Sequence, residues 1–171
     1  LEPLGLRLPW AFTEQQAGVL WGIRLPRIAL AALVGGTLAS SGAALQGMFR
    51  NPLADPGLIG VSSGASLAAV AVIVLGERLW GLVAGLSPGA ITTIALPGAA
   101  FAGGLAATLL VLRLARVGTP ADAGARSTAA TMLLCGVAVN AIAGAGVGFL
   151  VYLANDQQLR DVTFWTLGSL A

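Results

Sequence analysis

The segment MFRNPLADPGLIGVSSGA, residues 48–65, decides how this chain is organised. It places an arginine, an asparagine, an aspartate and two prolines between two long runs of Ala, Leu, Val and Gly. Pro52 and Pro56 have no backbone N–H, and each pushes the residue before it out of the α region. A helix is therefore predicted to end near Arg50, and the segment is predicted to reverse the chain between two helices.

The same segment contains residues that favour the reversal. Asn51 and Asp55 each precede a proline, and both residue types start turns by bonding their own backbone. Ser62 or Ser63 is placed to cap the helix that follows. The local sequence therefore predicts a turn with its own hydrogen bonds.

The composition indicates where the helices lie. Of the 171 residues, 57% are hydrophobic and 9% are charged, whereas a soluble domain carries about 25% charged residues. So few charges cannot cover a compact soluble domain with a solvated surface. We therefore expect an all-α, polytopic transmembrane helix bundle surrounded by membrane lipid, with no nucleic-acid partner.

Four segments are predicted to cross the membrane, because a crossing helix needs about 20 apolar residues. They are residues 28–48, 58–76, 92–112 and 128–153. Residues 1–27 and 154–171 then lie on one side, since four crossings return the chain to the side on which it began. The chain is expected to be a single membrane domain and a piece of a longer polypeptide.

The residue types exclude several kinds of chemistry. The chain has no lysine, so it holds no Walker A phosphate loop. It also has no histidine, which excludes a Ser-His-Asp triad and a histidine haem ligand. Cys135 is the only cysteine, so no intrachain disulfide forms. We expect no catalytic residue, metal site or resident cofactor in this chain.

Charge does not orient the chain in the membrane. Cytoplasmic loops carry an excess of Lys and Arg, but the arginines divide almost evenly between the two predicted sides. One side has Arg50, Arg113, Arg116 and Arg126, and the other has Arg7, Arg24, Arg27, Arg78 and Arg160.

Two stretches resemble a known family. RLPRIALAALVGGTLASSGAALQGMFRNPLADPGLIGVSSGA, residues 24–65, and FWTLGSL, residues 164–170, are similar to the FecCD-type permeases of bacterial ABC importers, which take up iron chelates and vitamin B12. The resemblance covers nearly the whole chain but about half of a family member. It implies the type II ABC importer permease fold, here the N-terminal half without its first helix.

The resemblance also implies partners and a location. Family members are multi-pass proteins of the bacterial inner membrane that work as homodimers with two ATPase subunits and a periplasmic binding protein. ATP and Mg²⁺ would belong to the ATPase, so the permease would not be an enzyme. Residues 1–27 and 154–171 would be periplasmic, and the RNPLADPG loop would face the cytoplasm.

Site residues carried over from the family fall into two groups. The residues that would narrow the cytoplasmic end of the pathway are Asn51, Pro52, Leu53, Thr128, Ala129 and Ala130, the last three from the loop between the third and fourth spans. The residues that would lie at the periplasmic mouth are Phe164, Trp165, Gly168 and Ser169. Gln46 and Asn140 are polar within spans, and each either bonds a neighbouring helix or lines the pathway.

The substrate implied first is haem, because the two stretches look most like the haem permeases. Ferric siderophores come next and cobalamin third. Functions of other classes stay open, namely a membrane enzyme, an assembly subunit without transport and a passive channel. An enzyme needs convergent titratable groups within the bundle, whereas every acidic residue here is placed in a loop.

Overall fold

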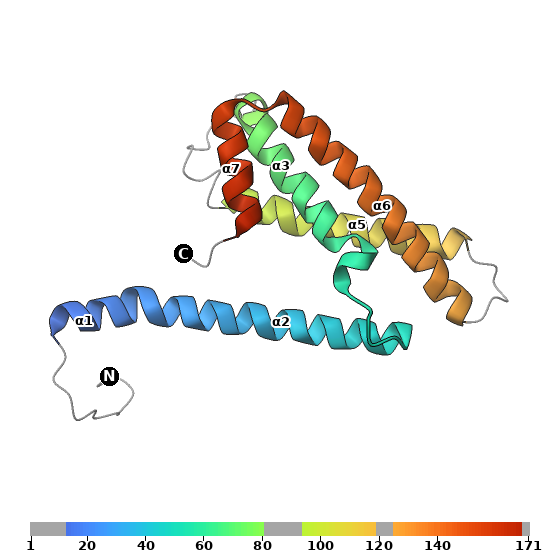
Figure 1. Ribbon diagram of the computed structural model, residues 1–171, viewed down its shortest axis with the longest axis horizontal. Coiled ribbons are helices and arrows are strands. Elements are labelled where there is room, and N and C mark those ends of the chain that lie inside the picture. The colour runs from blue at the N-terminus through green and yellow to red at the C-terminus, as the bar shows by residue number, and fades with distance from the viewer. Residues whose placement is uncertain (1–12, 81–93, 119–124, 169–171) are drawn as a thin grey trace. The chain divides into compact units, whose positions relative to one another are not determined.

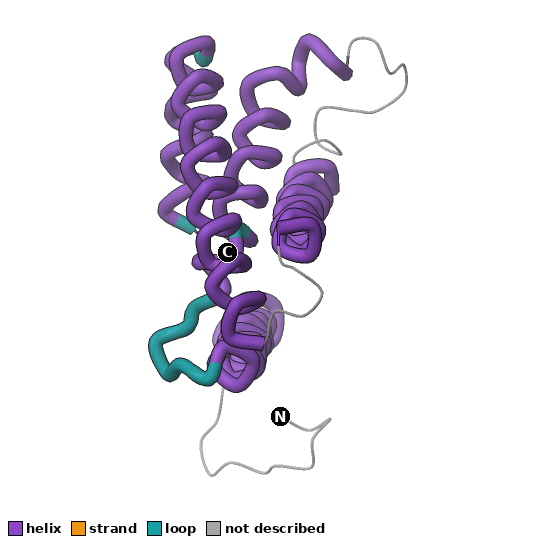
Figure 2. Tube along the Cα trace, turned by 90° about the vertical axis from the view of Figure 1, so that its right-hand side faces the viewer, coloured by secondary structure: helices purple, strands orange, loops and turns teal. Residues whose placement is uncertain are grey.

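The computed structural model describes residues 13–80, 94–118 and 125–168. These residues form helices and turns, and none of them lies in a strand (Figure 2). The chain separates into two compact units, residues 1–40 with 169–171, and residues 41–168. The candidate functional site lies in the second unit.

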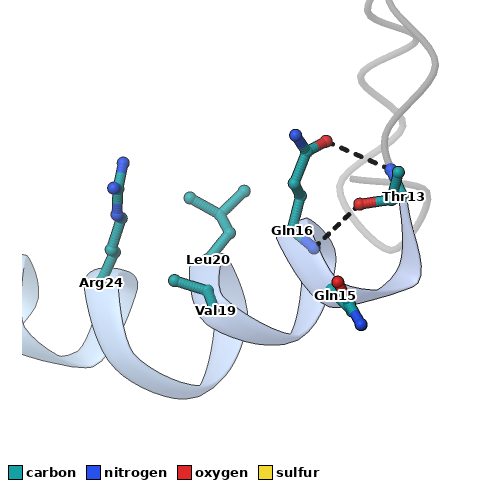
Figure 3. Close-up of a pocket in the computed structure, with 6 residues that line it drawn as sticks. All are labelled: Thr13, Gln15, Gln16, Val19, Leu20 and Arg24. Carbon is teal, nitrogen blue, oxygen red and sulfur yellow. Dashed lines mark hydrogen bonds between the residues drawn. The ribbon is translucent and has the colours of Figure 1, made fainter.

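A continuous helical stretch opens the described chain. It consists of α1 (Glu14–Val19), the π turn η2 (Leu20–Arg24) and α2 (Leu25–Phe49). The first helix starts with a capping box, in which the Thr13 hydroxyl accepts the Gln16 N–H and the Gln16 side chain accepts the Thr13 N–H (Figure 3). This arrangement satisfies two amide donors that have no partner inside the helix.

The first helical stretch contains Pro26, so it starts earlier than the sequence predicted. A proline inside a helix removes one hydrogen bond and crowds the carbonyl four residues before it. Here the Leu25 N–H bonds the Leu20 carbonyl across a wider π turn, which carries the helix past the proline. The predicted boundary at residue 28 is corrected, because the helix already begins at Glu14.

The end of α2 agrees with the sequence. Arg50 adopts a left-handed conformation with φ of 49°. Its N–H bonds the Gly47 carbonyl at 3.3 Å, and the Asn51 N–H bonds the Gln46 carbonyl at 3.1 Å. This pair of bonds is the Schellman arrangement that closes helix C-termini. The prediction that the helix ends near Arg50 is confirmed.

The next helix starts later than predicted. Residues Pro56–Ile59 form the 3-10 turn η3, and Gly60 follows with φ of 84°, a conformation that favours glycine. Helix α3 (Val61–Trp80) begins only then, with the Gly64 N–H bonded to the Gly60 carbonyl at 2.9 Å. The predicted span 58–76 is therefore displaced, and Gly60 occupies the capping position expected for Ser62 or Ser63.

The structure describes three further helices in the second unit. They are α5 (Leu96–Gly118), α6 (Ala125–Leu153) and α7 (Asp156–Leu167). Pro97 is the second residue of α5, and residues 94 and 95 directly before this helix are in a π-helical conformation. Helix α5 extends to Gly118, six residues beyond the predicted span 92–112. Helix α6 begins three residues before the predicted span 128–153 and ends at Leu153 as expected.

The helices of the second unit pack through small residues. Helix α5 crosses α3 and α6, which lie side by side (Figure 1). At the α3–α5 crossing, a methyl group on Gly64 would lie 2.5 Å from the Gly103 carbonyl oxygen. In lipid, helices associate through such close backbone approach. The neighbouring core is aliphatic, with Val70, Val74, Leu150 and Val162 in one cluster.

Three described helical stretches are long and apolar enough to cross a membrane, namely Glu14–Phe49, Leu96–Val117 and Ala129–Leu153. Val61–Gly76 is a shorter apolar helix. It belongs to α3, whose 20 residues extend about 30 Å at 1.5 Å per residue, about the thickness of a hydrocarbon core.

Candidate functional site

The turn between α2 and α3, residues 50–60, is built from two successive Asx-proline units. The Asn51 side-chain oxygen accepts the Leu53 N–H at 2.9 Å, and the Asp55 carboxylate accepts the Gly57 N–H at 2.7 Å. Each side chain thus bonds the backbone two residues on, across a proline that offers no N–H. The predicted turn role of Asn51 and Asp55 is confirmed.

Backbone bonds inside the segment satisfy further donors. The Ala54 N–H bonds the Asn51 carbonyl at 3.1 Å, and the Leu58 N–H bonds the Asp55 carbonyl at 3.0 Å. The Gly60 N–H bonds the Gly57 carbonyl at 3.2 Å. A segment that pairs its own donors can lie away from bulk water at a lower cost than an irregular loop.

The turn packs directly on the middle of α6. The Leu58 carbonyl lies so close to Gly136 that a methyl group there would overlap it. A methyl group on Gly60 would lie 3.1 Å from the Val139 side chain. Ile59 is buried, whereas Leu58 is exposed. Glycines on both elements therefore let the turn approach the helix at backbone distance.

Asn140 adds polar bonds to this contact. Its Nδ2 donates to the Gly57 carbonyl at 3.0 Å. The Ser63 hydroxyl lies within hydrogen-bonding distance of both the Asn140 Oδ1 and the Gly60 carbonyl. Asn140 is half-buried, and of the two alternatives the sequence left open for it, the structure shows a bond to a neighbouring element.

The predicted gate residues 51–53 form the exposed tip of the turn. Asn51 and Pro52 are exposed, and the Leu53 side chain is 83% exposed. The next residue, Ala54, is buried at 5% exposure. The structure therefore presents an apolar side chain on a turn whose base is held against α6.

Two different expectations follow from the sequence for the second gate segment, and the structure agrees with one of them. The family resemblance assigned Thr128, Ala129 and Ala130 to a loop, whereas the predicted span began at residue 128, and all three lie in the first turns of α6. Ala129 is half-buried and Ala130 is exposed, while the side chain of Thr128 lies outside the described residues. Ala130 is roughly 9 Å along the helix axis from Gly136, where the turn packs.

The predicted mouth residues belong to α7 and its end. Phe164 is 69% exposed, Trp165 is half-buried, and the Gly168 N–H closes the helix on the Trp165 carbonyl at 3.1 Å. The Gln158 side chain fastens this helix to α3 by donating to the Val74 carbonyl at 3.2 Å. Ser169 lies outside the described residues.

Gln46, the other polar residue predicted within a span, lies near the end of α2. The Gln46 side chain is exposed, and its backbone carbonyl closes the end of α2.

A pocket of about 520 Å³ lies along α1 and η2 (Figure 3). Arg24 is the one charged residue among the six described residues that line it, and no carboxylate or thiol faces it there.

The contact partners of the turn were not found from the sequence. Gly136 sits in the apolar run MLLCGVAV, and Ser63 follows the turn in GVSSG. Both are small residues in a glycine-rich chain, so their type alone carries no signal. Only the fold shows that they meet around Asn140.

Comparison with known proteins gives a consistent result. Residues 6–171 match the FecCD transport family. The chain is 45% identical over 169 residues to the hemin transport system permease protein of Yersinia pestis, covering 98% of this chain and 46% of that protein. It is 41% identical over 163 residues to the cobalamin import system permease protein of Halobacterium salinarum, covering 95% and 39%.

The fold has a solved counterpart. A chain described as a metal-chelate type ABC transporter in an inward-facing conformation superimposes with a TM-score of 0.70 at 30% identity. The match covers 97% of this chain and 46% of that one. The chain therefore spans less than half the length of these relatives. Because the family match covers nearly every residue, and the apolar helices and the 48–65 segment agree with it, the chain belongs to the FecCD transport family.

Proposed function

We propose that this chain forms part of the permease subunit of an ATP-driven importer that carries haem across the bacterial inner membrane. The observation that supports this most strongly is the 45% identity over 98% of the chain to a hemin permease. The helices are consistent with a membrane conduit, since three of those described are long and apolar enough to cross. A polar, self-bonded turn is tolerated at membrane depth where it lies against protein or lines a cavity.

In this proposal the conduit has a narrow point at each end. Asn51, Pro52 and Leu53 contribute to the cytoplasmic gate together with Thr128, Ala129 and Ala130. A gate needs an element with two arrangements and rigid flanks. The self-bonded Asx-proline units on either side of the exposed Leu53 would supply the rigid flanks. Phe164, Trp165, Gly168 and Ser169 contribute to the periplasmic mouth.

Energy comes from other subunits in this proposal. The sequence has no lysine and hence no Walker A loop. Two ATPase subunits would bind ATP and Mg²⁺, a second permease copy would complete the conduit, and a periplasmic protein would deliver the ligand. The proposed location is the bacterial inner membrane, with residues 154–171 on the periplasmic side.

A second substrate is supported by its own observation. The chain is 41% identical to a cobalamin permease and 38% identical, over 95% of its length, to a vitamin B12 permease of Vibrio cholerae. Haem and cobalamin are both bulky tetrapyrrole-type metal complexes, so a wide pathway lined by small side chains would suit either. A ferric siderophore is the remaining alternative.

Uptake by reconstituted vesicles tests the proposal. The full-length permease is placed in proteoliposomes with its ATPase and loaded binding protein, and labelled haem, cobalamin and a ferric siderophore are compared. We expect ATP-dependent accumulation of haem at least about tenfold above vesicles with a hydrolysis-deficient ATPase. If only cobalamin or only the siderophore accumulated, that compound would replace haem as the assigned substrate. ATP-independent flux of all three would indicate a passive channel.

A further inference from the structure

We propose that Asn140 is a positioning residue, which fastens the turn 55–60 to the middle of α6 so that the Leu53 tip moves with this helix. The inference rests on the proposed function, because it concerns the same turn. It begins with one side chain that bonds two parts of a distant segment. The Asn140 Nδ2 donates a hydrogen bond to the Gly57 carbonyl, and the Asn140 Oδ1 accepts one from the Ser63 hydroxyl. These partners lie 83 and 77 positions away in the sequence.

The depth of Asn140 makes these bonds important. It lies close to the midpoint of Ala129–Leu153, one of the stretches long and apolar enough to cross a membrane. If that stretch spans a bilayer, the Gly57 carbonyl that it binds lies within the thickness of the membrane. A backbone carbonyl at that depth needs a protein or water partner, since lipid offers none.

Steric contact alone would leave the turn free to slide. Gly136 and Gly60 allow close approach of the turn to α6, but they supply no directional bond. The Asn140 amide supplies a donor and an acceptor in a fixed plane, which sets where the turn sits along the helix. Leu53 is 83% exposed, and it lies between the end of α2, to which Asn51 is bonded, and this attachment at the base of the turn.

The local hydrogen bonds form two adjoining groups. Leu53 and Ala54 donate to Asn51, whereas Gly57 and Leu58 donate to Asp55 and Gly60 donates to Gly57. Ala54, which is buried at 5% exposure, joins the two groups, so a shift of the base is expected to reach the tip. Displacement of α6 would therefore be passed to Leu53 through Asn140, rather than being absorbed within the turn.

The experiment compares variants of the full-length permease. Asn140→Ala removes the bonds to both Gly57 and Ser63. Ser63→Ala removes only the bond between Ser63 and Asn140, so it keeps the inference testable if Asn140→Ala does not fold. Thr108→Val is the matched control, because it removes a half-buried hydroxyl whose 2.8 Å bond to the Gly104 carbonyl stays within α5. Amide hydrogen exchange is followed over residues 51–60 and over the helices, and the ATP hydrolysed per substrate imported is measured in vesicles.

We expect exchange in residues 51–60 to speed up about threefold for each bond lost, and up to about tenfold in Asn140→Ala. Exchange in α5 and α6 should not change, and Thr108→Val should match the parent. The ATP hydrolysed per substrate should rise severalfold in Asn140→Ala, because a loosened tip no longer follows α6. A merely structural defect would instead speed exchange throughout and lower uptake and hydrolysis together.

Two results would overturn the inference. Unchanged exchange in residues 51–60 would show that Asn140 does not hold the turn, and faster exchange with an unchanged ATP-to-substrate ratio would show that the attachment does not position the tip. If the parent imports none of the probes, the proposed function fails, while the exchange measurement still decides whether Asn140 fastens the turn.

Discussion

Gly64 and Gly103 set the separation of α3 and α5, because each glycine faces the other helix where they cross. A methyl group on Gly64 would lie 2.5 Å from the Ala107 Cβ, and one on Gly103 would lie 2.5 Å from the Ala68 Cβ. The pattern is reciprocal, with a glycine and an alanine four residues apart on each helix. Such small-xxx-small pairs allow the close backbone approach that holds helices together in lipid.

Gly103→Ala is expected to destabilise the protein by about 1–3 kcal/mol, the range measured for overpacking a fitted interior. The matched control is Gly148→Ala, since no atom lies within 4 Å of the methyl group it would add. That control should be neutral, or more stable by up to about 1 kcal/mol because alanine is the better helix former. The free energy of unfolding in detergent would be measured for both variants. Equal values for Gly103→Ala and Gly148→Ala would contradict the close approach of α3 and α5 at Gly103.

Helix α7 shows how a short element is held at the end of the bundle. Asn155 and Gln158 form a capping box, with bonds of 2.9 and 3.1 Å between each side chain and the other residue's N–H. Gln158 also donates to the Val74 carbonyl of α3, and Val162 packs in the aliphatic core. One glutamine thus both starts the helix and docks it.

Removal of the cap should loosen the start of α7 without releasing the core. Asn155→Ala is expected to cost about 1 kcal/mol of local stability, which corresponds to about fivefold faster amide exchange in the first turn. Asn155→Asp keeps the acceptor and should leave exchange near the parent rate. The capping account would be wrong if alanine and aspartate had the same effect in exchange monitored by mass spectrometry.

The two ends of α3 are far apart, which gives the second unit two distinct faces. The turn 50–60 lies at the Val61 end, and α7 is bonded near the other end, at Val74. Thirteen residues separate these positions in the sequence, or about 20 Å along a helix axis. If the long apolar helices span a bilayer, the turn and α7 face opposite sides of it.

The sequence predicted those features that depend on neighbouring residues. The Asx-proline units, the end of α2 and the end of α6 follow from local chemistry, since prolines and Asx side chains act within a few residues. The start of the first helix was missed, because a π turn compensates for Pro26. The predicted span placed Thr128, Ala129 and Ala130 in a helix, which α6 confirms, and only the loop implied by the family resemblance is corrected.

Long-range contacts could not be predicted from the sequence. The Asn140 bond to Gly57 joins residues 83 positions apart, and a polar residue within a span indicates a partner without naming it. The contact of Gly136 with Leu58 depends in the same way on how the turn lies on α6. Only the folded chain shows that these residues form one attachment.

Labelling from the two sides of the membrane tests the central claim most directly. Leu53→Cys and Gln157→Cys are made separately in the full-length protein with Cys135 replaced by serine, and a membrane-impermeant maleimide is applied to intact spheroplasts and to inverted vesicles. Both positions are exposed in the structure. We predict that cysteine at 157 reacts only in spheroplasts and cysteine at 53 only in inverted vesicles. Labelling of both from the same side would contradict the account.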